Sequence, residues 1–331
     1  MRFLWLYQYL PNYNFDHFLH MDVAECMNNI PDIEVKCYGP GLHLSNPKLT
    51  ITQYSENTTI NSLYNKWEFD VIIICTKSRM FRNYLPIHAI DNTRGEIGTD
   101  TEWLPKDFSQ FTKAKKIVLE EDYHYEGPDK WYKDRGVDAI LQRHFVNIEQ
   151  GINKGGYNIP HIFFPFSFAP NTFRDFGKQR VNLIKYTGST NNKYYLDRVA
   201  CKKILEDNGI LARTPQMRTD DEYINDLNSF TVHMSGQSKY YILPAKIFEI
   251  AACGSVLFTN ANPKSGIQKV FSDTSYVKWE DDFSDVLLKA NMILNDSFMR
   301  NKITTAAKEE VMNRHTHEVR TKELLEIVGK L

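Results

Sequence analysis

One stretch in the second half of the chain most constrains its fold: an apolar segment bounded by Pro244 and Gly254, followed at once by Ser-Val-Leu-Phe-Thr at 255–259. Proline suits the first turn of a helix, where its missing N–H removes no hydrogen bond, and glycine commonly ends a helix. The short apolar run behind it predicts a buried strand. A helix that leads into a buried strand is typical of an α/β protein.

This helix also carries a charged pair. Lys246 and Glu249 are three residues apart, so they share a face near the helix N-terminus. A lysine beside a helix N-terminus suits a phosphate group, and a glutamate one turn further on can accept two hydroxyl groups of a ribose. The simpler alternative is an ordinary Lys–Glu pair in solvent.

The same strand–loop–helix order runs through the whole chain of 331 residues. Apolar runs predict strands at 3–9, 33–38, 69–75, 116–120, 137–141 and 161–164, and again at 182–186, 231–234 and 276–279. Helical patterns occupy 16–29, 195–208, 283–294, 297–313 and 317–328. Strands that alternate with helices predict parallel, doubly wound sheets, in which ligands bind beyond the carboxyl ends of the strands.

The length predicts two domains rather than one. A stiff connector with two prolines, Phe164-Pro-Phe-Ser-Phe-Ala-Pro-Asn171, separates the two halves of the pattern. We therefore expect an N-terminal domain at 1–168 and a C-terminal domain at 169–316.

Composition and the absence of certain motifs argue against several classes of protein. The net charge of −1 argues against a broad nucleic-acid-binding surface, although a local basic groove remains compatible with it. The chain contains no apolar run of the ~18 residues that a membrane span needs. Its five cysteines form no CxxC pair, which favours reduced thiols in a cytoplasmic protein. The absence of GxGxxG and GxxxxGK[ST] motifs disfavours dinucleotide enzymes and P-loop phosphoryl transfer.

Three loops of the second half are expected at one edge of a sheet. Thr187-Gly-Ser-Thr190 follows a strand and precedes a helix whose first turn carries Arg198, and Ser235-Gly-Gln-Ser238 follows the next strand. Backbone N–H groups of such loops can bind phosphate. Together with the Lys246 helix they predict a nucleoside-diphosphate site that contains Gly188, Ser189, Thr190, Arg198, Ser235, Lys246 and Glu249.

These residues carry a resemblance to a known family. The second half resembles the glycosyltransferase group 1 proteins of GT-B fold, most closely their CgeB-like (spore maturation protein) branch. The resemblance covers about 180–329 and rests on Tyr186-Thr-Gly-Ser-Thr190, Tyr194, Arg198, the segment 246–254, and the tail His315-Thr-His-Glu-Val-Arg320. It is looser over the first half.

The resemblance implies two Rossmann-like doubly wound domains facing across a cleft, with a final helix at 317–331 that crosses back toward the N-terminal domain. It implies transfer of a sugar from a UDP- or GDP-type nucleotide sugar to a glycan or other hydroxyl acceptor, with retention. Because the second half already supplies a diphosphate site, we expect no required metal or other cofactor. The resemblance places Glu249 on the donor ribose and Lys246 near the diphosphate, and adds Tyr194 and Phe248 to the donor site. Tyr241 stands where many group 1 enzymes carry a second glutamate near the donor sugar, so this motif does not identify the sugar.

The first half is then expected to bind the acceptor. Its polar candidates follow predicted strands: Asn14, Asp16 and His17 after the first, Asp122 and His124 after 116–120, and Arg143 after 137–141. An inverting transferase needs a general base, whereas a retaining one mainly positions its substrates and stabilises charge. His124 and Asp122 are therefore the catalytic candidates, first for positioning. The alternative for each is an ordinary core or surface residue without a catalytic role.

Four alternatives remain open. The acidic run Glu120-Glu-Asp122 together with a diphosphate would suit Mg²⁺ or Mn²⁺, but the site in the second half makes a metal unnecessary. A transferase that acts on modified DNA bases would use basic residues such as Arg79, Arg82, Arg94 and those of 113–116. A nucleotide-sugar epimerase or hydrolase would turn over the donor without an acceptor. A catalytically silent module would bind the donor without breaking it.

Overall fold

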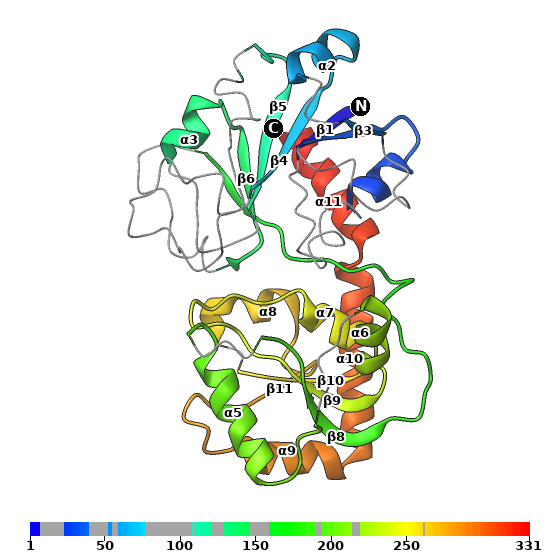
Figure 1. The fold of residues 1–331 in the computed structure, drawn as a ribbon, viewed down its shortest axis with the longest axis vertical. Coiled ribbons are helices and arrows are strands. Elements are labelled where there is room, and N and C mark those ends of the chain that lie inside the picture. The colour runs from blue at the N-terminus through cyan, green and yellow to red at the C-terminus, as the bar shows by residue number, and fades with distance from the viewer. Residues whose placement is uncertain are drawn as a thin grey trace. The chain divides into compact units, whose positions relative to one another are not determined.

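The computed structural model describes the chain in segments: 1–6, 23–39, 52–54, 59–76, 108, 110–120, 129–145, 159–189, 193–213, 219–260 and 262–331. The chain divides into two compact units (Figure 1). The first unit comprises Met1–Phe164 and Arg320–Leu331, and the second comprises Pro165–Val319.

The described part of the first unit is built on a seven-stranded sheet with the order β3-β2-β1-β4-β5-β6-β7, in which each pair of neighbouring strands is parallel. Its strands are β1 Arg2–Leu6, β2 Glu34–Tyr38, β3 Thr52–Tyr54, β4 Val71–Thr76, β5 Lys115–Glu120, β6 Ala139–Gln142 and β7 His161–Phe163. Residues 23–28 are helical, and helices α2 Ile60–Lys66 and α3 Asp129–Asp134 follow.

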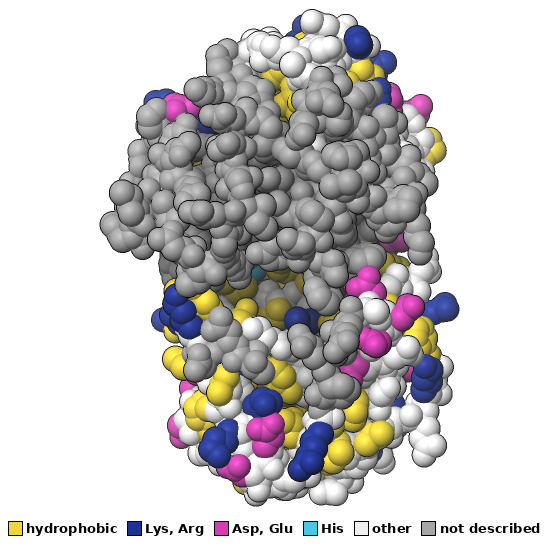
Figure 2. Space-filling view, viewed as in Figure 1, with side chains coloured by type: hydrophobic (Ala, Val, Ile, Leu, Met, Phe, Trp, Pro, Cys, Tyr) yellow, Lys and Arg dark blue, Asp and Glu magenta, His cyan; other side chains and the backbone are white. Residues whose placement is uncertain are grey.

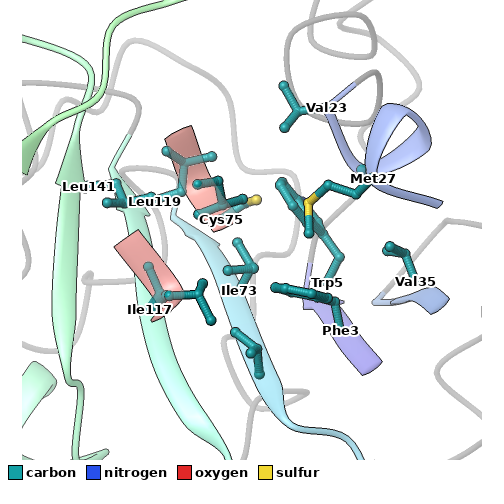
Figure 3. Close-up of a cluster of buried hydrophobic side chains, with 14 of the residues drawn as sticks. Phe3, Trp5, Val23, Met27, Val35, Ile73, Cys75, Ile117, Leu119 and Leu141 are labelled. Carbon is teal, nitrogen blue, oxygen red and sulfur yellow. The ribbon is translucent and has the colours of Figure 1, made fainter. Parts of the chain in front are cut away.

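Both faces of this sheet are buried. Alternate residues of β1 point to opposite sides, so Phe3 and Trp5 belong to one apolar cluster while Leu4 and Leu6 belong to the other. Figure 3 shows Phe3 and Trp5 among side chains from the neighbouring strands. Leu324 of α11 (His317–Lys330) packs into the same cluster, although most of the chain separates it from β1. Burial on both faces explains the continuous apolar runs in the strands.

The second unit repeats this logic on a four-stranded parallel sheet with the order β11-β10-β9-β8 in its described part. Its strands are β8 Val181–Tyr186, β9 Phe230–Met234, β10 Val256–Thr259 and β11 Val277–Lys278. Its helices are α5 Leu196–Asp207, α6 Asp220–Leu227, α7 Lys246–Ala252, the 3-10 turn η6 Pro263–Ser265, α8 Ile267–Val270, α9 Val286–Asn295 and α10 Ser297–Arg314, followed by the first residues of α11.

The expected alternation of strands and helices is confirmed, and most differences lie at the ends of elements. Strand β3 and helix α2 fall in a polar region whose pattern is too weak to predict them. Helix α9 begins three residues later than its pattern suggests, because Phe283 has a left-handed backbone (φ 62°) that a helix does not accept.

The helix that the sequence predicts between Pro244 and Gly254 ends at the predicted place. Gly254 has φ +76°, the left-handed conformation that commonly terminates a helix. At the other end, α7 begins at Lys246 rather than at the proline. The carbonyl oxygens of Pro244 and Ala245 accept from the N–H groups of Ile247 (3.3 Å) and Phe248 (3.0 Å), a tight turn ahead of the regular helix.

Two segments that lead from one unit to the other are joined inside the second unit. Phe168 forms a parallel bridge with Thr316, and its backbone N–H donates to the carbonyl oxygen of His315 over 3.1 Å. The side chains of Ser167 and His317 are hydrogen-bonded over 2.9 Å. The connector and the start of α11 are therefore held side by side where the chain passes between the units.

Candidate functional site

Three loops of the second unit lie at the carboxyl edge of its sheet. Strands β8, β9 and β10 run parallel, so the described residues that follow them (187–189, 235–238, 260 and 262) are brought to one edge. Helix α5 begins after the first loop and α7 after the second. The expected convergence of these loops is therefore a consequence of parallel pairing.

Arg198 is the central charge at this edge. Its side chain is only 2% exposed, its Nε donates to the carbonyl oxygen of Gly236, and its guanidinium carbon lies 3.9 Å from the centre of the Tyr195 ring. Burial lowers the pKa of the guanidinium, which nearby tyrosines partly oppose. No carboxylate of the described residues forms an ion pair with it. A buried cation without an anionic partner is costly, so this position favours an anionic ligand.

Gly188 brings the backbone of the first loop against this charge. It has φ +140°, and a Cβ atom built on it would lie 2.7 Å from Arg198 Nη1 and 3.9 Å from Lys246 Cδ. A side chain at this position would therefore displace the guanidinium, and only glycine adopts the backbone angle readily. The loop backbone, the guanidinium and the lysine meet at one place.

Lys246 adds a second positive charge as the first residue of α7. It is half-buried, and burial lowers the pKa of its ammonium group. Arg198 acts in the same direction, whereas Glu249 opposes the shift. No hydrogen bond or ion pair from the described chain reaches Lys246 Nζ. Two cations that form no ion pair with a described residue thus lie beside one glycine loop.

Glu249 lies one helical turn further along α7 and is 9% exposed. Tyr223 of α6 donates a hydrogen bond from its hydroxyl group to Glu249 Oε2, and no described residue donates to Oε1. Burial raises the pKa of this carboxyl group. The Tyr223 hydrogen bond and the positive charges of Lys246 and His317 lower it, and Asp220 raises it. One carboxylate oxygen is therefore held by the protein while the other can accept from a ligand.

Tyr223 is a site residue that sequence reasoning missed. Its helix starts at a strong local signal: Thr219 caps α6, and Thr219 and Glu222 form a reciprocal capping box. The capping box predicts the helix, but it does not predict that Tyr223 reaches a carboxylate 26 residues later.

The second loop is fixed by Asn260, which sequence reasoning also missed. The Asn260 side chain accepts from the Gln237 N–H (2.9 Å) and donates to Asp197 Oδ2 (2.9 Å). A Cβ atom on Gly236 would lie 2.1 Å from Asn260 Oδ1, so this close approach requires glycine. Ser235 is fully buried, and its hydroxyl group has no hydrogen-bond partner among the described residues.

The remaining donor candidates differ in their surroundings. Phe248 is buried, with its ring centre 5.7 Å from that of Phe271 and 4.8 Å from that of His315, so it packs inside the unit. Tyr194 is half-buried beneath two lysines, and the Ser189 carbonyl accepts from the Tyr186 hydroxyl group. Thr190 lies outside the described residues.

In the first unit, Arg143 is 2% exposed. Its Nη1 donates to the Phe164 carbonyl oxygen over 3.4 Å, and its guanidinium lies over the Phe164 ring. This burial favours packing over direct contact with a substrate. The other candidates of the first half, Asn14, Asp16, His17, Asp122 and His124, lie outside the described residues, as do Arg79, Arg82 and Arg94.

The described residues offer neither a metal-binding cluster nor a membrane-spanning helix. They contain no group of three or more His, Cys, Asp or Glu side chains placed to hold a metal ion. Within the same residues, no helix has the length and hydrophobicity that a bilayer crossing requires. The five cysteines all lie within the described residues, and no disulfide joins any of them.

Comparison with known proteins identifies the fold. Residues 217–326 match a family model described as glycosyl transferase-like. A glycosyltransferase from Rickettsia africae ESF-5 superposes with a TM-score of 0.64 at 13% identity, over 99% of this chain and 98% of that one. Anabaena Alr3699/HepE in complex with UDP superposes with a TM-score of 0.62 at 9% identity, over 100% of both chains.

A third similar structure is an alpha-glucosyltransferase in complex with UDP-glucose and DNA containing an abasic site. Its TM-score is 0.64 at 12% identity, over 99% of both chains. No curated protein sequence matches this chain. At these identities the likeness establishes the fold alone, and it confirms the expected α/β GT-B class with two parallel sheets.

Proposed function

We propose that this protein is a glycosyltransferase that moves a sugar from a UDP-type nucleotide sugar to a hydroxyl group of a glycan or similar acceptor. One observation carries the proposal: Arg198 is a buried cation with no carboxylate partner among the described residues, and it lies beside Gly188 and Lys246. A diphosphate would supply the negative charge that this arrangement lacks. Fold neighbours in complexes with UDP and UDP-glucose support the uridine nucleotide as the first to test.

Each donor-site residue then has a role. Arg198, Lys246 and the backbone of Gly188 bind the diphosphate, and Glu249 Oε1 accepts from the ribose hydroxyl groups while Tyr223 holds Oε2. Within group 1, we assign the chain to the CgeB-like branch on the motifs at 186–198 and 246–254.

The reaction is a retaining transfer. The bond between the anomeric carbon and the β-phosphate oxygen breaks, and the acceptor oxygen bonds to the same face of that carbon. The acceptor proton passes to an oxygen of the departing diphosphate, so UDP leaves and no general base is needed. Arg198 and Lys246 stabilise the charge that develops on the diphosphate, the task that a metal performs in other transferases. Asp122 and His124 position the acceptor.

The test is a thermal-shift panel of UDP, GDP, dTDP, CDP and ADP on the wild type and on Glu249→Ala. A ligand that binds only the folded state stabilises it by about 2.7 kcal/mol at ~100 times its Kd. We expect UDP to raise the melting temperature of the wild type, and Glu249→Ala to abolish the rise. Glu206→Ala, which changes a glutamate of α5 that pairs with Lys202, is the matched control and should keep the rise.

Two outcomes would contradict the proposal. The first is a wild type that none of the five diphosphates stabilises. The second is an equal loss of the UDP effect in Glu249→Ala and in Glu206→Ala. Turnover of a UDP-sugar at the same rate with and without acceptors would indicate a hydrolase instead.

A further inference from the structure

Next to the proposed donor site, the second unit carries three exposed lysines over three half-buried tyrosines. We call this set the Tyr–Lys surface. It consists of Lys193, Tyr194, Lys239, Tyr240, Tyr241 and Lys264. Figure 2 shows basic (dark blue), acidic (magenta) and hydrophobic (yellow) side chains interspersed on the visible face of the second unit.

The contacts within this surface are specific. The ammonium nitrogens of Lys193 and Lys239 lie 5.3 and 5.4 Å from the centre of the Tyr194 ring, and Lys239 lies 4.9 Å from the Tyr240 ring. The centres of the Tyr194 and Tyr240 rings are 6.3 Å apart. These are cation–π distances, so each of these exposed lysines lies close to a tyrosine ring.

The turn that presents two of the tyrosines is fixed by its own backbone. Tyr241 has φ +60°, a left-handed conformation that is unfavourable for a residue with a side chain. Ser238 holds the turn: its carbonyl oxygen accepts from the Tyr241 N–H (2.9 Å), and its hydroxyl oxygen accepts from Tyr240 N–H (3.2 Å) and Ile242 N–H (3.4 Å). Because these hydrogen bonds fix the strained turn, the tyrosines are already in position before a ligand binds.

The loops that carry this surface have positively charged side chains but no negatively charged ones. The segments 187–196, 235–246 and 260–270 contain lysines but no aspartate or glutamate, although the whole chain has a net charge of −1. Arg198 and Lys246 already match the charge of one diphosphate. The exposed lysines therefore add a positive potential that attracts a second anionic group.

We propose that the Tyr–Lys surface binds an acidic glycan, one that carries carboxylate or phosphate groups, as the acceptor. This inference rests on the proposed function, because it names the substrate class of the same site. Tyrosine rings pack against the apolar faces of sugar rings while their hydroxyl groups hydrogen-bond, and lysines pair with the acidic groups. The second unit thus contributes to acceptor recognition, a task that the sequence assigns to the first half alone.

The test is calorimetric titration with three probes: an oligogalacturonate, a neutral malto-oligosaccharide of the same length, and oligo(dT). The test variant combines Lys193→Gln, Lys239→Gln and Lys264→Gln. The matched control combines Lys203→Gln, Lys302→Gln and Lys308→Gln, which removes the same charge from exposed positions on α5 and α10 of the same unit. UDP-induced melting shifts are recorded for every protein.

We expect oligogalacturonate to bind the wild type and the control alike, and the test variant at least about tenfold more weakly. The neutral oligosaccharide should bind more weakly than the acidic one, and the UDP shift should be the same in all three proteins. Equal binding of the acidic and neutral probes, absence of oligogalacturonate binding, or equal losses in both variants would overturn the proposal. Tighter binding of oligo(dT) would indicate a nucleic-acid partner instead.

The two proposals fail in different ways. Lysine-dependent binding of oligogalacturonate without any UDP shift would leave the acidic-glycan surface standing and refute the donor site. A UDP shift without oligogalacturonate binding would do the reverse.

Discussion

Replacing Arg198 by methionine should separate ligand binding from folding. The guanidinium is 2% exposed and has no carboxylate partner in the described part of the chain. Replacing it therefore removes the free-energy cost of burying its charge in the folded protein. Against this gain stand the hydrogen bonds to the Gly236 carbonyl oxygen and to Tyr186 and the contact with the Tyr195 ring. Each is worth about 1–2 kcal/mol. We expect the stability of the free protein to change by no more than about 1 kcal/mol.

The effect on the ligand should be much larger. Losing one buried charged partner of a diphosphate costs about 3 kcal/mol, which weakens UDP binding roughly 150-fold. At a UDP concentration of ~100 times the wild-type Kd, the stabilisation then falls from about 2.7 to about 0.3 kcal/mol. A melting shift of about 5–10 °C in the wild type should shrink to about 1 °C.

Arg180→Met is the matched comparison, because Arg180 is a second arginine of the same unit whose partners are all present. Its guanidinium donates to six acceptors: the carbonyl oxygens of Leu227, Phe230 and Cys253 and the side chains of Asp175, Asn228 and Ser255. This variant should lose about 3–5 kcal/mol of stability and keep a UDP shift of wild-type size. The reasoning is refuted if Arg198→Met unfolds as readily as Arg180→Met, or if it retains the UDP shift.

Three further variants test other parts of the second unit. Tyr223→Phe removes a hydrogen bond that lowers the pKa of Glu249, so calorimetry from about pH 8 down to about pH 5 should show UDP affinity falling at a higher pH than in the wild type. His233 is fully buried, and burial lowers its pKa from 6.5 to about 3. Acidification below pH 6.5 therefore protonates this histidine only in the unfolded chain, and it lowers the free energy of unfolding by about 1.4 kcal/mol per pH unit. His233→Gln should remove this pH dependence, as measured by urea unfolding at about pH 7 and about pH 5. Gly254→Ala places a Cβ atom 2.7 Å from Asp175 Oδ2 at φ +76°, so it should lose about 1–2 kcal/mol in chemical denaturation with an unchanged Kd for UDP.

The sequence by itself determined the architecture. Apolar runs that alternate with helical patterns predict parallel sheets that are covered on both faces. The parallel pairing of β1 with β2 and with β4 agrees with this prediction. Local chemistry also set the end of α7 at Gly254 and the start of α6 at its capping box. In each case the cause lies within a few residues of the effect.

Only the tertiary structure decided which side chains meet. Tyr223 reaches Glu249 across 26 residues and Arg198 reaches Gly236 across 38, distances over which no period or motif extends. Phe248 shares a motif with Glu249 but points into the core, because successive helical residues face different directions. Parallel strands bring remote loops to one edge, so the partners of a buried charge depend on the pairing of the whole sheet, which a local stretch of sequence does not encode.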